Sequence, residues 1–178
     1  MAGEAFDITH DDTSLTVESP TVADVEALAD LWVDLARDQL EYGSHLRPSA
    51  NRGLVRDTIA HHVATDGLLV VRAAGDAEQG IVGFVMFSPE TGQYDQDVVR
   101  GVIQNLYVVP DCRGSGVGGR LLAAAEAALV DVGVDVVTLD AMAANEAARR
   151  FYRRHGYDTH RVELEKRVES DNKTRQDG

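Results

Sequence analysis

The segment 109–120, with the sequence VPDCRGSGVGGR, constrains this chain most, because it places four glycines between two apolar runs. The run before it, residues 101–108, predicts a strand, and residues 117–132 predict a helix. The first amides of such a helix have no intrahelical acceptor, and the helix dipole adds roughly half a positive charge at that end. The junction therefore predicts a site for a phosphate or pyrophosphate group.

The length and charge of the chain bound the classes of protein it can belong to. Its 178 residues suit one domain, which we place at 13–168, between a disordered N-terminus (1–12) and a disordered polar tail (169–178). A net charge of -13 argues against nucleic acid as a partner, because phosphate backbones need a basic surface. Aspartate outnumbers glutamate and arginine outnumbers lysine, a balance that resembles proteins of salt-loving organisms; an ordinary acidic protein is the other interpretation.

Other whole-chain features argue against membrane and metal classes. The chain contains no run of 18 apolar residues that could span a membrane. Its acidic N-terminus lacks the basic and then apolar pattern of a signal peptide, so we expect a cytoplasmic protein. The single cysteine, Cys112, excludes an intramolecular disulfide and a cysteine zinc site. The histidines (His45, His61, His62, His155 and His160 among them) are scattered, and no metal site is expected.

Hydrophobic periodicity predicts a mixed α/β fold. Residues 15–18 predict a first strand, and a capping-box-like Thr21–Asp24 precedes a helix whose inner face carries Val25, Leu28, Trp32, Leu35 and Ala36. Further elements follow: a loop (42–49), a helix (52–65), a hairpin (68–73 and 81–87), a strand (98–109), the helix after the glycines, a strand (134–139), a helix (145–155) and a final strand within 157–168. A helix joining two strands implies that those strands are parallel, while the hairpin implies antiparallel neighbours.

The glycines also match a dinucleotide-binding pattern. Gly114, Gly116 and Gly119 satisfy G-x-G-x-x-G, and Asp140 follows about twenty residues later, where a ribose carboxylate would stand. Four residues separate the glycines from the strand, however, and too little chain follows to complete a dinucleotide domain. A nucleoside-triphosphate loop would require a lysine that this turn lacks.

Two motifs resemble the GCN5-related N-acetyltransferases. Residues 113–118 fit R/Q-x-x-G-x-G/A, the family's acetyl-CoA motif, and residues 145–157 fit its N-x-x-A-x-x-x-Y-x-x-x-G-F/Y signature. Between and around them, residues 105–110 resemble the family's fourth strand and Leu121–Leu122 its third helix. The resemblance covers about 103–166. It implies a mixed, mostly antiparallel sheet with one splayed parallel strand pair and helices on both faces.

The resemblance implies an acetyl-CoA site. Backbone groups of Leu106, Tyr107 and Val108 would pair with the pantetheine arm as an added strand does. Asn145 and Ala148 would contact that arm, Tyr152 would lie near the thioester sulfur, and the loop holding Tyr42, His45 and Arg47 would line the acceptor side. The pyrophosphate would be held by amides of the glycine turn, namely those of Arg113, Gly114, Ser115, Gly116, Val117, Gly118, Gly119 and Arg120.

The implied chemistry is direct attack of an amine on the thioester. Tyr152, a phenol that stays protonated at neutral pH, is the candidate acid for the departing thiolate; otherwise it is a plain core aromatic. Asp140 is the candidate base, where members resembling ribosomal-protein alanine acetyltransferases carry a glutamate. The shorter aspartate leaves a water relay open, which Gln104 or Asn105 could position, and a capping or surface carboxylate is the other interpretation.

The acceptor remains open between a small-molecule amine and a protein N-terminus or lysine. A site without a firm base suits an α-amine, with a pKa near 8, better than a lysine amine near 10.4. A second class of function is a non-catalytic acyl-CoA-binding regulatory module, which would have no need of Tyr152. A homodimer is compatible with the resemblance, because members often pair through C-terminal strands.

Overall fold

The computed structural model of this chain describes residues 16–73, 80–92 and 95–168. The predicted N-terminus 1–12, the tail 169–178 and most of the predicted turn between the hairpin strands lie outside these residues. Within them a five-stranded sheet has the order β1-β2-β3-β4-β5. Its strands are β1 (Val17–Glu18), β2 (Leu68–Arg72), β3 (Ile81–Pro89), β4 (Arg100–Val108) and β5 (Val136–Leu139).

The sheet is antiparallel except at one pair. β1, β2, β3 and β4 pair antiparallel in succession, and β4 pairs with β5 in parallel. The two parallel strands are joined by α3 (Val117–Asp131), as a crossover requires. The predicted mixed, mostly antiparallel sheet with one parallel pair is therefore confirmed.

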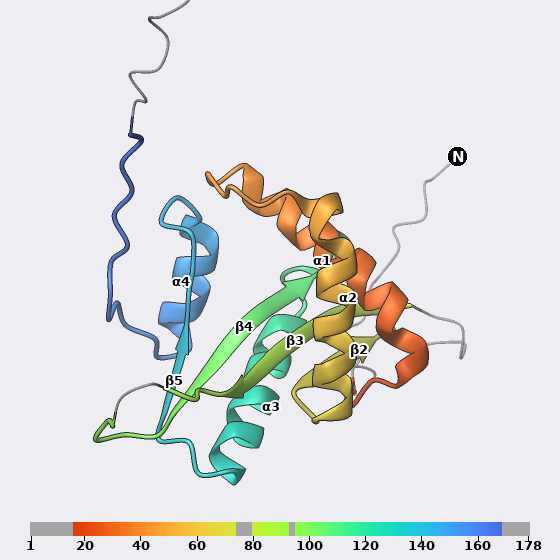
Figure 1. Cartoon of the computed structure of the whole chain (residues 1–178). Helices are drawn as coiled ribbons and strands as arrows, with labels where there is room; N and C mark the ends of the chain where they lie inside the picture. The colour runs from red at the N-terminus through yellow and green to blue at the C-terminus, as the bar shows by residue number, and fades with distance from the viewer. Residues whose placement is uncertain (1–15, 74–79, 93–94, 169–178) are drawn as a thin grey trace, which may run out of the picture.

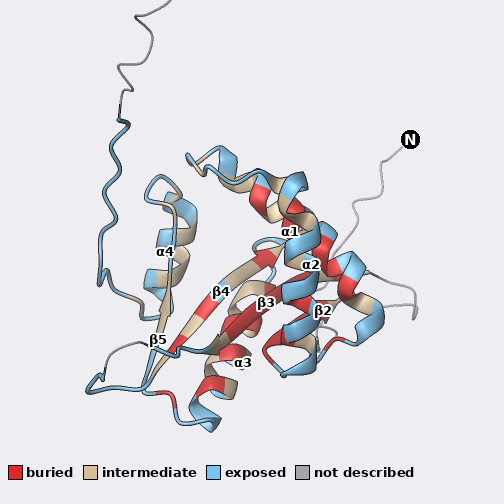
Figure 2. Ribbon diagram, viewed as in Figure 1, coloured by how far each residue is buried: buried red, intermediate tan, exposed pale blue. Residues whose placement is uncertain are grey.

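Helices cover both faces of the sheet (Figure 1). α1 (Val25–Leu40) and α2 (Pro48–Ala64) pack on one face, in a core that includes Leu28, Ile59 and Phe84. α3 packs on the other face through Leu121, Leu122 and Leu129, and α4 (Glu146–Arg154) lies at its edge. Figure 2 shows the buried residues gathered along the sheet and on the helix faces turned toward it.

The apolar face predicted for the first helix is confirmed. Val25, Leu28, Trp32 and Ala36 are buried, and Leu35 packs against the same core. The predicted Thr21–Asp24 pair also forms, since Asp24 Oδ2 accepts from the Thr21 backbone N–H at 2.7 Å. It stands before a short 3-10 turn, Val22–Asp24, that leads into α1.

Two sequence predictions about element bounds are wrong. The loop predicted over 42–49 ends early because α2 begins at Pro48, whose fixed φ and missing N–H suit the first helical position. No strand forms in 157–168, where the chain is irregular and Val162, Leu164 and Val168 are 73%, 90% and 88% exposed. The alternating apolar pattern is present there, but it has no neighbouring strand to pair with among the described residues.

Two glycines lie in opposite environments, which generates a stability prediction. A Cβ added at Gly67 would lie 2.7 Å from both His62 Nδ1 and the Phe87 carbonyl oxygen, whereas one added at Gly53, inside α2, would meet nothing within 4 Å. We expect Gly67→Ala to lower the free energy of unfolding by about 1–3 kcal/mol through overpacking. Gly53→Ala should raise it by about 1 kcal/mol through helix propensity. Urea denaturation measures both; a Gly67→Ala protein as stable as the wild type would contradict this packing.

Candidate functional site

The two parallel strands, β4 and β5, separate near one edge of the sheet. Pairing between β4 and β5 runs from Arg100↔Val136 to Ile103↔Leu139, where β5 ends. β4 continues to Val108 and remains paired with β3 on its other side. Among the described residues, no strand lies beside the backbone of Leu106 and Tyr107 on the β5 side, so its polar groups can pair with an extended ligand.

A β-bulge interrupts β4 at the point of separation. Asn105 pairs with Met86, while Ile103 pairs with Phe87, so Gln104 is an extra residue on β4. Bulges bend a strand and redirect side chains, and they are frequent beside active sites. Here the bulge follows the last β4–β5 pair directly and so helps to part the two strands.

The glycine-rich turn forms the predicted strand-to-helix junction. After a short 3-10 turn, Pro110–Cys112, the chain passes Gly114 (φ 78°) and Gly116 (φ 87°), both left-handed conformations that favour glycine. Gly116 is the N-cap of α3, which begins at Val117. The first amides of α3 thus point out of the helix end, as the sequence predicted.

The Arg113 side chain links this turn to α1 and β4. Its Nη2 lies 2.7 Å from Asp38 Oδ2 of α1, its Nε donates to the Val108 carbonyl at 2.9 Å, and its guanidinium carbon stands 5.5 Å from the Tyr107 ring centroid. Its side chain therefore holds protein groups, and its predicted contact with pyrophosphate rests on the backbone. The Val108 carbonyl, expected to pair with the pantetheine arm, already has a donor in Arg113.

The start of α3 also packs against α4. A Cβ added at Gly118 would lie 3.5 Å from Phe151, and one added at Gly119 would lie 3.1 Å from His155 Nε2. These two glycines therefore permit close approach of α4 as well as exposing backbone amides. Sequence reasoning missed this contact with His155, because nothing in the sequence shows which side chain meets a small residue.

The predicted arm-binding residues Asn145 and Ala148 contact each other. Asn145 is the N-cap of α4, and its Oδ1 accepts from the Ala148 backbone N–H at 3.0 Å. This bond occupies the only backbone donor of Ala148. The Nδ2 end of the Asn145 amide makes no hydrogen bond with the residues that the structure describes, and it can donate to a ligand.

Tyr152 projects from α4 into an aromatic cluster. Its ring lies 5.2 Å from the Phe151 ring and 5.8 Å from the Tyr157 ring. Burial raises the pKa of Tyr152 to about 12. Burial and the bond from its hydroxyl to Glu126 Oε1, at 2.7 Å, also raise the pKa of Tyr157 above its usual range. Tyr152 is thus a neutral phenol at any physiological pH.

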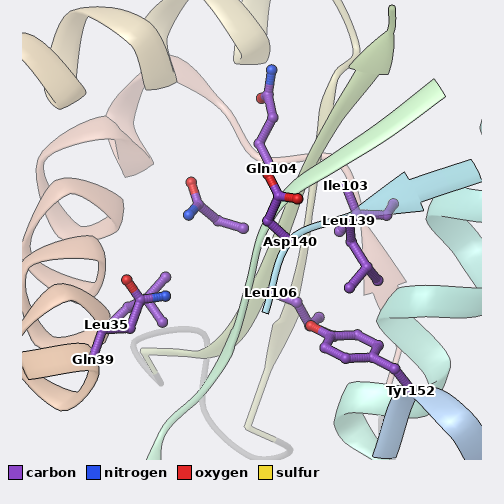
Figure 3. Close-up of a pocket in the computed structure, with 9 residues that line it drawn as sticks. Leu35, Gln39, Ile103, Gln104, Leu106, Leu139, Asp140 and Tyr152 are labelled. Carbon is purple, nitrogen blue, oxygen red and sulfur yellow. The ribbon is translucent and has the colours of Figure 1, made fainter. Parts of the chain in front are cut away.

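The two predicted catalytic residues line one cavity of about 40 Å³, which lies where β4 and β5 separate (Figure 3). Asp140 stands at the end of β5 and is exposed, and Tyr152 approaches from α4. The full lining is Leu35, Gln39, Ile103, Gln104, Asn105, Leu106, Leu139, Asp140 and Tyr152. The structure therefore brings Tyr152, Asp140 and the free β4 edge to one place.

Two carboxamides of this site come from outside the recognised motifs. Gln39, near the end of α1, lines the cavity although no sequence signal marked it. Gln104, which the sequence suggested as a water-positioning residue, lines it from the bulge. A turn-by-turn count along α1 could place Gln39 beside Leu35, four residues earlier, but could not show that this face meets β4.

The three predicted acceptor residues do not line this cavity. Tyr42, His45 and Arg47 lie in the connection between α1 and α2. His45 Nε2 stands 2.9 Å from Glu165 Oε2, and both side chains are mostly exposed. The Arg47 carbonyl accepts from Asn51 at the start of α2. The loop that holds these residues therefore contacts the C-terminal segment 157–168 through His45 and Glu165.

Two further expectations concern membranes and metals. No helix in the described ranges is long and apolar enough to cross a membrane. Within the same ranges, no group of three or more His, Cys, Asp or Glu side chains is arranged to hold a metal ion.

Comparison with solved structures supports the fold. A GCN5-related N-acetyltransferase from Ralstonia eutropha shares 22% identity, with a TM-score of 0.67, and the match covers 86% of this chain and 98% of that one. A transcriptional regulator from Bacillus halodurans matches with 19% identity, a TM-score of 0.64 and coverage of 86% and 99%. An aminoglycoside acetyltransferase from an uncultured soil sample matches with 19% identity, a TM-score of 0.61 and coverage of 89% and 99%.

The sequence comparisons give the family. No curated protein matches the chain. The acetyltransferase (GNAT) family profile matches residues 28–157, which include α1, the sheet from β2 to β5, the glycine turn and α4. The chain therefore belongs to the GNAT acetyltransferase family.

Proposed function

We propose that this protein transfers the acetyl group of acetyl-CoA to a primary amine by direct attack within a ternary complex. One observation carries the proposal: Tyr152, Asp140 and the unpaired edge of β4 border the same cavity. Membership of the acetyltransferase family supports acetyl transfer in general. The donor, the acceptor and the residue roles below are inferred from the site.

The donor would lie along β4 and end at the glycine turn. Backbone groups of Leu106 and Tyr107 are placed to pair with the amides of the pantetheine arm, because β5 has already ended. Amides at the start of α3, after Gly116, would hold the pyrophosphate. The Nδ2 group of Asn145 would donate to the arm from the other side.

The chemical step requires two proton transfers, one from the attacking amine and one to the departing sulfur. The neutral amine attacks the thioester carbonyl carbon, the C–N bond forms, and the C–S bond breaks. Tyr152 would donate its phenolic proton to the departing thiolate and then take a proton back from solvent, and the raised pKa keeps the phenol protonated at neutral pH. The proton lost by the amine would pass to solvent through a water held by Asp140.

Asp140 suits a relay better than direct abstraction. Its side chain is exposed at the end of a short strand, and Gln39, Gln104 and Asn105 border the same cavity. The cavity volume of about 40 Å³ is enough for at least one water, which needs roughly 10–15 Å³ and two or more polar partners. This arrangement favours an acceptor that is already partly neutral, such as an α-amine.

Both acceptor classes remain compatible with the site, and a small amine is favoured by one comparison. The soil-derived neighbour is an aminoglycoside acetyltransferase, which acts on an amine-bearing small molecule. A non-catalytic regulatory module would bind acyl-CoA through the same backbone groups. The placement of Tyr152 beside Asp140 favours the enzyme, because a sensor needs neither group there.

The glycine turn generates a binding prediction. Acetyl-CoA at 100 times its Kd should stabilise the native state by about 2.7 kcal/mol, which raises the melting temperature by roughly 5–10 °C. Gly116→Glu should abolish that shift, because it places bulk and negative charge at the phosphate position. The matched control is Gly133→Glu, since Gly133 has nearly the same φ (88° against 87°) and equally open surroundings at the far end of α3. It should retain the shift; loss in both variants or in neither would contradict the assignment.

Tyr152 generates a kinetic prediction. Tyr152→Phe should lower kcat by about 100-fold, the lower range for general acid catalysis, with little change in the KM for acetyl-CoA. Tyr157→Phe is the control, because its hydroxyl is already bonded to Glu126; its kcat should stay near that of the wild type. Because the raised pKa lies at about 12, the phenol stays protonated below that value, and activity should not fall with Tyr152 ionisation between pH 7 and 10. An unchanged kcat in Tyr152→Phe would remove its acid role.

The same proposal includes a homodimer formed through segment 157–168. Its alternating apolar side chains are exposed, and β5 is the edge of the described sheet. Antiparallel pairing of two such segments about Glu163 would set Arg161 opposite Glu165 and Val162 opposite Leu164, twice each by symmetry. Glu163 would face its own copy, a like-charge pair that opposes pairing, so the support for a second copy of this chain comes from the Arg161–Glu165 and Val162–Leu164 pairs.

The dimer has a direct test in solution mass. Leu164→Asp should convert a dimer, of twice 19.3 kDa, into a monomer, because it places a charge in the paired face. Leu54→Asp, at an exposed leucine on α2, is the matched control and should remain dimeric. Light scattering after size exclusion measures both. A monomeric wild type, or a dimeric Leu164→Asp variant, would refute the pairing.

A further inference from the structure

Gln104 is set apart from the other residues of β4 by its place in the bulge. It stands between Ile103, the last residue paired with β5, and Asn105, which pairs with Met86. Because it is the extra residue of the bulge, its side chain is released from the regular alternation of the strand. It is exposed, yet it lines the cavity that holds Asp140 and Tyr152.

The protein fixes the orientation of the Gln104 amide. Its Nε2 donates to Ser88 Oγ of β3 at 3.2 Å, and the amide also interacts with the ring of His62 on α2. His62 is 6% exposed and packs closely against Gly67, where an added Cβ would lie 2.7 Å from its Nδ1. The amide is therefore bonded to β3 and lies beside a buried histidine of α2.

The protonation state of His62 agrees with this orientation. Burial lowers the pKa of His62, the neighbouring His61 lowers it further, and the bond with Gln104 raises it in part. The ring is thus neutral at neutral pH, with one N–H to donate.

The fixed amide keeps hydrogen-bonding capacity to spare. A carboxamide has two N–H donors and an oxygen with two lone pairs. One donor is used by Ser88 and at most one lone pair by the His62 ring, so at least one donor and one acceptor remain. Figure 3 shows Asp140 between Gln104 and Tyr152. In this view Gln104 therefore lies on the far side of Asp140 from Tyr152.

The charges of the side chains that line the cavity restrict the class of ligand that could bind there. Asp140 is the only carboxylate in the lining, the other polar side chains except Tyr152 are the carboxamides Gln39, Gln104 and Asn105, and no lysine or arginine is among them. One carboxylate suits one ammonium or amine. Carboxamides suit neutral partners that both donate and accept, such as amides and hydroxyls.

We infer that Gln104, held by Ser88, binds a neutral amide or hydroxyl group next to the acceptor amine and so determines acceptor specificity. The enzyme would prefer an amino amide or an amino sugar to a plain alkylamine. This inference rests on the proposed acetyl transfer. Since one net hydrogen bond is at stake on an open surface, the preference should be roughly five- to tenfold.

The test compares three probe amines: L-alaninamide, D-glucosamine and propylamine. In the wild type and in Gln104→Met, which keeps the length but not the polarity, kcat/KM is measured for each probe with saturating acetyl-CoA. The ratio of alaninamide or glucosamine to propylamine should fall roughly five- to tenfold in the variant. Because each ratio is compared between two proteins, differences in amine basicity cancel. If only the alaninamide-to-propylamine ratio falls, the acceptor is peptide-like. If only the glucosamine-to-propylamine ratio falls, the acceptor is sugar-like.

Ser88 supplies a test of positioning that leaves the cavity lining intact. Ser88→Ala should lower the same ratio in part by freeing the Gln104 amide, and Ser88→Thr, which keeps the hydroxyl, should restore it. A merely structural role would change all three probes equally. Unchanged ratios in Gln104→Met, or no rescue by Ser88→Thr, overturn the inference.

Cofactor binding separates this inference from the proposed function. The melting shift with acetyl-CoA is recorded for every variant. Acetylation of propylamine with no preference for the polar probes overturns the role of Gln104 and leaves acetyl transfer standing. Binding of acetyl-CoA without acetylation of any probe overturns both.

Discussion

The separation of β4 from β5 after Ile103 and Leu139 is the constraint on which the rest of the site depends. A parallel ladder that continued to Val108 would satisfy the backbone of β4 with protein and leave no place for an extended ligand. The bulge at Gln104 and the early end of β5 prevent this. The separation also leaves Asp140 at a strand end, where its side chain is exposed beside the free edge.

The glycine turn and α4 are coupled through the same few residues. Gly114 and Gly116 take left-handed conformations that let the chain turn into α3, and Gly118 and Gly119 allow Phe151 and His155 of α4 to approach. α4 in turn sets Tyr152 against the cavity. Arg113 joins the turn to Asp38 of α1. A phosphate-binding junction and the placement of a phenol are therefore parts of one packing arrangement.

The sequence correctly predicted the features that depend on the local pattern of residues. The inner face of α1, the β2–β3 hairpin and the helix after the glycines follow from periodicity, and they were confirmed. The strand predicted within 157–168 was wrong, because alternation shows that a segment can pair and not that a neighbour is present. Gln39, the bulge at Gln104 and the burial of His62 could not be foreseen, since each depends on which element packs across from it.

This difference explains why the donor side of the site is readable from sequence and the acceptor side is not. The donor would be held mainly by backbone groups, whose availability follows from glycines, a strand end and a helix start that lie close together in the chain. The acceptor would meet side chains from α1, from the β4 bulge and from the end of β5, which are separated by 35 residues or more along the chain. Each of those side chains can change without disturbing the sheet, because the fold depends on their backbones alone. A family can therefore keep one donor while its members diverge in the acceptor they take, and a carboxamide fixed by Ser88 is the kind of feature in which such divergence is expressed.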